Sequence, residues 1–144
     1  MAKNNDLNSQ FVLFNPTFTF ATPGDLGVSY GSQSGRYALI GPAVFVVVSI
    51  TFTPTFTTSA GAALINAAPF AATQESSFVT GNMNANWTWP VGITQITPYI
   101  ASGATTWTVA GNGTIANRTD LTTANITSGV STSISFSGFY FRSY

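Results

Sequence analysis

Acid–base and nucleophilic chemistry depends on ionisable side chains, and this chain of 144 residues has very few of them. Its charges at neutral pH come from eight residues: Asp6, Asp25, Glu75, Asp120, Lys3, Arg36, Arg118 and Arg142. The sequence has no His and no Cys, so it lacks the usual general base, the usual thiol nucleophile and the commonest transition-metal ligands. We therefore expect a protein that is not an enzyme, with no catalytic site, no metal site and no cofactor.

The four carboxylates stand far apart in the sequence, so their spacing indicates no paired or clustered site. Glycoside hydrolysis uses two carboxyl groups about 5 to 9.5 Å apart, and calcium takes about six to eight oxygen ligands. Serines are plentiful, but without a His to activate one we expect no serine nucleophile and no G-x-S-x-G elbow. We interpret Asp25 as a turn residue and Asp120 as a residue that precedes a strand or turn.

Small polar residues interleaved with Phe, Val, Ile and Trp take the place of charges, and this composition favours β-strands. The clearest strand covers residues 43–53, where every second residue from Val44 to Phe52 is apolar and predicts a buried face. The opposite face is apolar at Phe45 and Val47 and carries hydroxyl groups from Ser49 onward. We expect the first part of this strand to be covered on both faces and the second part on one.

Shorter alternating segments predict further strands. Residues 17–20 alternate Thr and Phe before a turn at residues 22–25, Thr-Pro-Gly-Asp. Residues 133–141 end in aromatic side chains on both faces, so we place them in the centre of a sheet or at an oligomer axis, with Gly138 as a bulge or close packing point. Residues 60–72 carry a weak helix signal, and we expect a loop and a short strand there. The alternation recurs in three pairs, Trp87 with Trp89, Tyr99 with Ala101 and Trp107 with Val109.

The balance of charge and hydropathy bears on the partners of the protein. The net charge is zero, so the protein has no positive electrostatic field that would attract a nucleic acid. The mean hydropathy is +0.25. The longest apolar run, residues 43–48, is far shorter than the roughly 20 residues of a membrane-spanning helix. We expect one soluble domain made in a cytoplasm, without nucleic acid or membrane partners. Near-neutral proteins tend to associate, so we also expect a closed homo-oligomer that buries aromatic surface between subunits.

Aromatic side chains offer one candidate binding surface. Ring faces pack on the apolar faces of sugars while Asn and Thr supply neutral hydrogen bonds. In this interpretation Trp87, Trp89, Tyr99 and Trp107 contact a glycan, with Trp87 and Trp89 on one face of a strand. The same residues are good core and interface anchors, and we favour that role.

The N-terminal residues 1–10 are polar and give way abruptly to the apolar residues 11–14. They lack the apolar stretch of a signal peptide. They form either a disordered tail or an arm that orders on a neighbouring surface, with residues 11–14 fixing the arm to the domain. In the arm interpretation the contacts with a partner come from Lys3, Asn4, Asn5, Asp6 and Leu7.

Residues 35–41 are Gly-Arg-Tyr-Ala-Leu-Ile-Gly and precede the long strand, and residues 136–140 are Phe-Ser-Gly-Phe-Tyr. Together with residues 68–70 (Ala-Pro-Phe) and 98–100 (Pro-Tyr-Ile), these segments resemble the knob domains of tailed-bacteriophage fibres and related virion proteins. The resemblance covers about residues 15–144. In that family a G-x-Y-x-x-I-G turn opens the long strand, and an I-x-x-S-G-x-Y-like strand ends the chain.

The resemblance implies an all-β fold, an antiparallel jelly-roll-like β-sandwich, that assembles as a homotrimer without a catalytic site. We therefore predict a knob domain at residues 15–144 and an N-terminal arm at residues 1–14. Fibre proteins usually carry a long stalk before the knob, whereas here the domain begins within about fifteen residues of Met1. A trimeric knob without a stalk fits a capsid decoration, or cement, protein that binds the major capsid protein on the virion surface and stabilises the assembled shell.

An alternative is the receptor-binding knob of a tail fibre or tail tip, in which the aromatic residues named above bind a glycan of the host surface. A secreted ligand of the tumour-necrosis-factor type shares the trimeric sandwich, but we find no signal or membrane anchor of the expected kind. Both phage roles use the same scaffold and differ only in their surface residues, so the sequence leaves both open.

Overall fold

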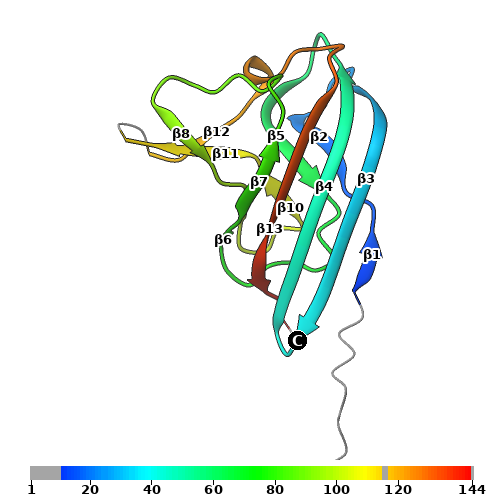
Figure 1. Cartoon of the computed structure of the whole chain (residues 1–144), viewed down its shortest axis with the longest axis vertical. Coiled ribbons are helices and arrows are strands. Elements are labelled where there is room, and N and C mark those ends of the chain that lie inside the picture. Colours follow the sequence, from blue (N-terminus) through cyan, green and yellow to red (C-terminus); the bar gives the residue numbers. More distant parts are fainter. Residues whose placement is uncertain (1–10, 115–116, 144) are drawn as a thin grey trace, which may run out of the picture.

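The regular secondary structure of the described chain is almost entirely β-strand (Figure 1). A computed structural model describes residues 11–114 and 117–143. These residues form thirteen strands in three sheets and one short 3-10 helix, Thr123–Asn125. Every pairing between neighbouring strands is antiparallel. The predicted all-β, antiparallel fold is therefore confirmed.

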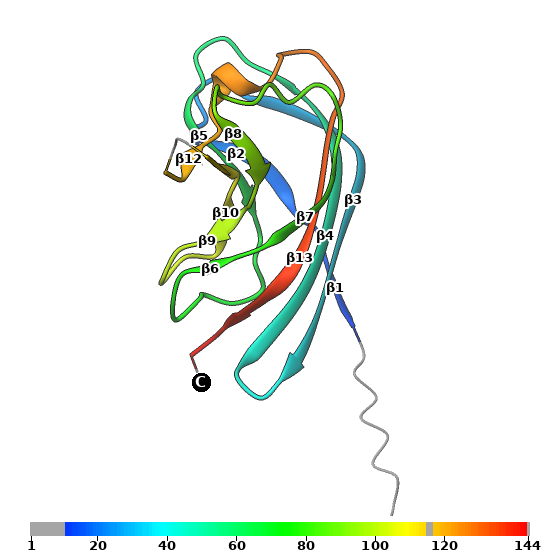
Figure 2. The same ribbon diagram turned by 60° about the vertical axis from the view of Figure 1, so that its left-hand side comes forward.

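Two of the three sheets form the layers of a sandwich (Figure 2). The large sheet contains, in spatial order, β1 (Val12–Phe14), β3 (Gly27–Ile40), β4 (Ala43–Thr55), β13 (Thr132–Phe141) and β7 (Val79–Met83). The facing sheet contains β2 (Thr17–Thr22), β5 (Ala60–Asn66), β10 (Thr106–Thr108), β9 (Tyr99–Ile100) and β6 (Ser76–Ser77). The small sheet contains β12 (Thr119–Asp120), β11 (Ala110–Gly113) and β8 (Ile93–Ile96).

The core lies between the large sheet and the facing sheet. Every second residue of β4 from Val44 to Phe52 is at most 2% exposed, so the predicted buried face is confirmed. Phe18 of β2 stacks on Phe52 with ring centroids 4.2 Å apart, and Trp107 of β10 is fully buried. This apolar burial is the main source of stability in a chain without disulfides.

The C-terminal strand β13 lies between β4 and β7, so its predicted central position is confirmed. Gly138 is a close packing point, because a Cβ there would lie 2.8 Å from a ring carbon of Phe78. Two residues further on, the hydroxyl of Tyr140 donates to the Phe70 carbonyl (3.0 Å) and accepts from its backbone N–H (3.2 Å). Burial raises the pKa of Tyr140 to about 12.

One expectation from the resemblance and one prediction from the alternation differ from the structure. Residues 35–40 continue β3 in register with β4, and the chain reverses only at Gly41 and Pro42, where Gly41 takes a φ of +57°. Trp87 and Trp89 lie in the loop between β7 and β8 rather than on one face of a strand. By contrast, β5 runs through Leu64 and Ile65, where we predict a short strand.

Part of the predicted arm belongs to the large sheet, because Val12–Phe14 pair with β3 as β1. The ring of Phe14 covers Gly35, where a Cβ would lie 2.6 Å from that ring. The same ring lies 6.1 Å from the Trp107 ring, centroid to centroid. These contacts attach the start of the described chain firmly to the domain.

The turn at residues 22–25 ends β2 as predicted, and Gly24 takes a φ of +55° there. The carboxylate of Asp25 accepts hydrogen bonds from the backbone N–H groups of Thr57 (2.9 Å) and Thr58 (2.8 Å) and from both hydroxyls. The hydroxyl and N–H of Thr57, followed by the groups of Thr58, hold the pKa of Asp25 well below its usual range. Asp25 is therefore a structural turn residue.

Replacement of Asp25 by Asn should lower the melting temperature at neutral pH. Because the folded-state pKa is lowered, the carboxylate stabilises the folded protein above its ordinary pKa of about 3.9 and loses this effect as the pH falls below it. Thermal unfolding at pH 7 and pH 3 should therefore show a smaller difference between wild type and Asp25→Asn at pH 3. Asp120→Asn, outside this turn, is the matched control. Equal differences at the two pH values would contradict the assignment.

Candidate functional site

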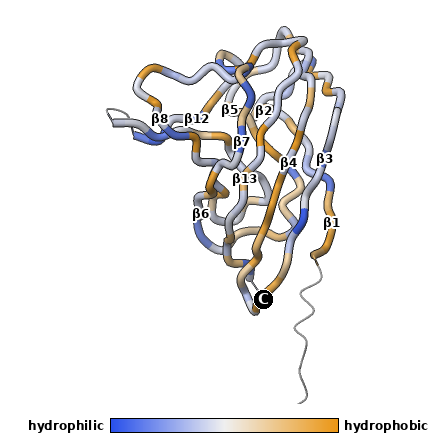
Figure 3. The backbone as a smooth tube through the Cα atoms, viewed as in Figure 1, coloured by the Kyte–Doolittle hydropathy of each residue, from blue (hydrophilic) through white to orange (hydrophobic). Residues whose placement is uncertain are grey.

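The outer face of the large sheet, which points away from the core, divides into a polar half and an apolar half. The polar half carries hydroxyl groups on three adjacent strands: Ser34, Ser49, Thr51, Ser133 and Ser135. The apolar half, named the apolar patch, consists of Phe11, Leu13, Ile40, Phe45, Val47, Val79 and Phe139. Figure 3 shows hydrophobic residues along β1 and β4, where part of this patch lies.

The residues of the patch are exposed although they are large and apolar. Their exposed fractions run from 40% for Phe45 to 73% for Leu13. The rings of Phe45 and Phe139 lie 5.5 Å apart, and with Phe11 and Val47 they surround a hollow of about 360 Å³. We expected this part of β4 to be covered on both faces, but no described residue covers its outer side.

The uncovered area is large for a chain of this size. Taking roughly 150 to 250 Å² for a fully exposed aromatic residue, and values near the lower end of that range for the aliphatic ones, the exposed fractions of the seven residues leave about 700 Å² of exposed surface. The largest patch on a typical monomer is about 300 to 600 Å², and a stable interface buries about 800 Å² per partner. The patch is therefore of the size that a protein–protein interface requires.

One charged residue, the exposed Arg36, lies on the outer face within the patch, between Leu13 and Val47. It is the one charged side chain in the described strands of the large sheet. Charged residues are depleted at the centres of interfaces, because they must give up water when they are buried. The composition of the patch is typical of an interface core rather than of a solvated surface.

The structure does not bring the four proposed glycan-contact residues together. Trp107 is fully buried and Trp87 is 4% exposed, with its indole N–H donating to the Ser133 carbonyl at 3.0 Å. Their assignment to a glycan surface is wrong, because sugars cannot reach core side chains. The guanidinium of Arg118 lies 3.6 Å from the centre of the Tyr99 ring and covers that face. Trp89 alone is substantially exposed, at 43%.

The proposed partner contacts of the arm, Lys3, Asn4, Asn5, Asp6 and Leu7, lie outside the described residues. The first described residue, Phe11, lines the hollow in the apolar patch. β1 lies near the same end of the molecule as the turn between β3 and β4 (Figure 1). The described chain thus begins beside the patch.

The described titratable groups include one ion pair and no cluster that could hold a metal ion. Within residues 11–114 and 117–143, no group of three or more His, Cys, Asp or Glu side chains is placed to hold a metal ion. Glu75 pairs with Arg118 at 2.5 Å, and this ion pair raises the pKa of the guanidinium. Contrary to our expectation, residues 27–31 (Gly-Val-Ser-Tyr-Gly) match the G-x-S-x-G pattern. Ser29 lies within β3, opposite Thr53, and not on a strand-to-helix turn.

In the part of the chain that the structure describes, no helix is long and apolar enough to cross a membrane. Comparisons with protein families, with curated proteins and with solved structures find no match. Evidence of function therefore comes from the surface of the molecule itself.

The different environments of the three tryptophans give a direct test of this surface. Acrylamide should quench the fluorescence of Trp89 and leave that of the buried Trp87 and Trp107 nearly unchanged. The variant Trp89→Phe should therefore lose the quenchable component, which steady-state fluorescence titration measures. The control Trp87→Phe should keep that component. Quenching that persists in Trp89→Phe would contradict the placement.

Proposed function

We propose that this chain is a non-catalytic structural protein of a bacteriophage virion, which assembles as a homotrimer through its apolar patch and decorates the shell. The observation that carries the proposal is about 700 Å² of exposed surface on large apolar residues of a protein with zero net charge. Such a surface associates in water unless a partner covers it. A second copy of the same chain is the partner that is always present.

The patch suits contacts between copies for a further reason. Its aromatic side chains are held on a continuous antiparallel sheet, so little side-chain and backbone freedom is lost when they are buried. The polar half of the same face can stay solvated in the assembly. The three-fold symmetry comes from the resemblance to phage knob domains, in which sandwiches of this kind form trimers.

Shell binding is supported by the resemblance and by the place where the described chain begins, at Phe11 beside the patch. Residues 1–10 join the chain at this residue, so three arms would leave the trimer near the contacts between its subunits. A trimer that binds the assembled shell and not free capsid protein stabilises the shell by mass action. In this proposal the arm residues Lys3 to Leu7 contact the major capsid protein.

A charge placed in the patch should break the trimer without unfolding the chain. Val47 is 48% exposed on the outer face of β4, so Val47→Lys leaves the lysine solvated in a single chain but buries it in an interface. We expect wild type to have three times the mass of the single chain by analytical ultracentrifugation, and Val47→Lys to have the mass of one chain with an unchanged circular dichroism spectrum.

The matched control is Thr51→Lys, four residues along the same strand and on the same face, but in the polar half. It should remain trimeric. A wild-type protein that is monomeric at tens of micromolar would overturn the proposal, as would a Val47→Lys variant with the wild-type mass.

Deletion of residues 1–10 should abolish shell binding and leave the trimer intact. Phage particles that lack this protein are incubated with the purified protein. A gold-labelled antibody against the β-sandwich then locates the bound protein by electron microscopy. Full-length protein should label the head, and the deleted chain should not. Label confined to the tail tip would contradict decoration and favour the receptor-binding knob, and equal labelling of the head by both proteins would remove the role of the arm.

A further inference from the structure

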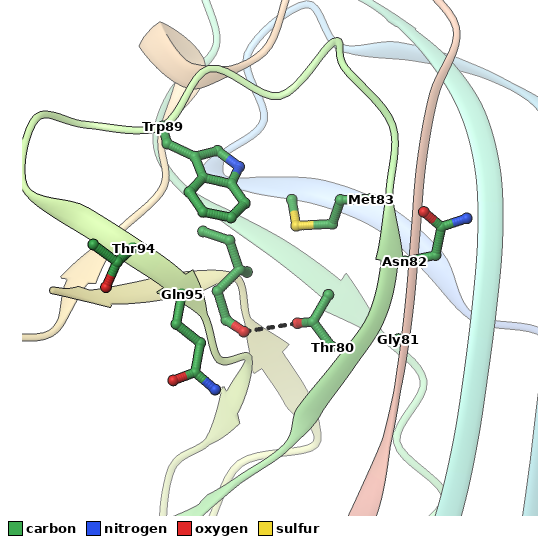
Figure 4. Close-up of a pocket in the computed structure, with 8 residues that line it drawn as sticks. Thr80, Gly81, Asn82, Met83, Trp89, Thr94 and Gln95 are labelled. Atoms are coloured by element: carbon green, nitrogen blue, oxygen red, sulfur yellow. Dashed lines mark hydrogen bonds between the residues drawn. The ribbon is translucent and has the colours of Figure 1, made fainter.

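A second surface feature lies away from the apolar patch, in a cleft between β7 and β8. β7 is an edge strand of the large sheet, and β8 is an edge strand of the small sheet. At one end the two sheets are tied together, because the Thr80 hydroxyl donates to the Ile96 carbonyl at 2.9 Å and the Phe78 N–H to the Pro98 carbonyl at 2.8 Å. At the other end the loop between β7 and β8 spans the gap and carries Trp89 (Figure 4).

The lining of this cleft combines apolar surface with neutral polar groups. The indole of Trp89 and the thioether of Met83 point toward one another from opposite sides (Figure 4). Thr94 and Gln95 of β8 border the hollow, with their side chains directed away from the gap between Trp89 and Met83. Ile96 and Thr80 complete the floor. The hollow measures about 310 Å³, and none of the residues that line it is charged. A volume of this size is at the lower limit of small-molecule sites, which begin at about 300 Å³.

The loop that carries Trp89 is fixed on both sides of this residue. On one side Trp87 is buried, and Thr88 exchanges hydrogen bonds with Asn125: its N–H donates to the Asn125 carbonyl and its carbonyl accepts from the Asn125 side chain, both at 2.9 Å. On the other side the Pro90 carbonyl accepts from the Ile93 N–H at 3.1 Å. A large aromatic side chain is thus held in place, yet 43% of it remains exposed. Such preorganisation lowers the cost of binding a ligand.

We propose that this cleft binds a neutral sugar ring. The electron-rich face of Trp89 attracts the weakly positive C–H groups on the apolar face of a pyranose. The Thr80 hydroxyl, which donates to the Ile96 carbonyl, can also accept a hydrogen bond from a sugar hydroxyl, and the Gln95 amide at the edge of the cleft can both donate and accept. No residue that lines the cleft is charged, so nothing there would offset the free-energy cost of removing an ionic ligand from water. The cleft should therefore exclude sugars with carboxylate, phosphate or sulfate groups.

The cleft remains accessible if the apolar patch is buried. Thr80 and Met83 pair with the inward-facing Phe136 and Ile134, so they point away from the outer face to which Val79 belongs. Sugar binding is therefore independent of the trimer. It adds attachment to a neutral glycan to the proposed structural role and does not rest on that role.

The test is saturation-transfer NMR on the full chain with methyl glycosides of glucose, galactose, mannose and N-acetylglucosamine, and with sialic acid as the anionic probe. We expect saturation transfer to at least one neutral glycoside and at least a tenfold loss of affinity in Trp89→Ala. Gln95→Ala should weaken binding less. The control Val47→Lys should bind as wild type does, which separates a failure of this proposal from a failure of the trimer.

Several results would overturn the proposal. These are the absence of transfer to every neutral glycoside, unchanged affinity in Trp89→Ala with an intact circular dichroism spectrum, and preferential binding of sialic acid. A Trp89→Phe variant guards against loss of structure in Trp89→Ala, because it keeps a smaller ring in the loop. Trp89→Phe should retain part of the affinity for the sugar. If Trp89→Ala and Trp89→Phe both kept the full affinity, the sugar would bind at another surface.

Discussion

Half of the large sheet is apolar on both of its faces, and the rest of the structure depends on this constraint. The inner face is satisfied by the core, where residues of β4 such as Val48 and Ile50 are fully buried. The outer face has no such partner within the described chain, and Phe45, Val47 and Phe139 stay in contact with solvent. The free-energy cost of that exposure is removed only when another surface covers it.

The scarcity of charge strengthens this constraint. Most soluble proteins offset exposed apolar surface with charged residues that keep copies apart, but only eight residues are charged here. The charges that the structure describes lie mainly outside the large sheet, for instance in the Asp25 turn and the pair of Glu75 with Arg118. Association is therefore favoured at the patch, while neutral hydroxyl and amide groups remain available on the polar half and in the cleft.

The sequence predicted those features that depend on local alternation. The period of two in β4 and β13 identifies their inner faces, and the Pro-Gly pair before Asp25 identifies the turn after β2. Alternation does not tell what covers a face, so it could not show that Phe45 is exposed. It also failed at Trp87, whose position depends on a hydrogen bond to Ser133, which is 46 residues away in the chain. The cleft was not predictable for the same reason, because it joins edge strands of two different sheets.

Hydroxyl-radical footprinting of the wild-type protein in solution, read by mass spectrometry, tests the central claim most directly. Aromatic side chains react according to their contact with water, and Trp89 provides an internal standard of known exposure in the same molecule. If the apolar patch is an interface between copies, Phe45 and Phe139 should be protected at micromolar concentrations while Trp89 is oxidised. Oxidation of Phe45 and Phe139 at the rate that their exposure in the single chain implies would contradict the account.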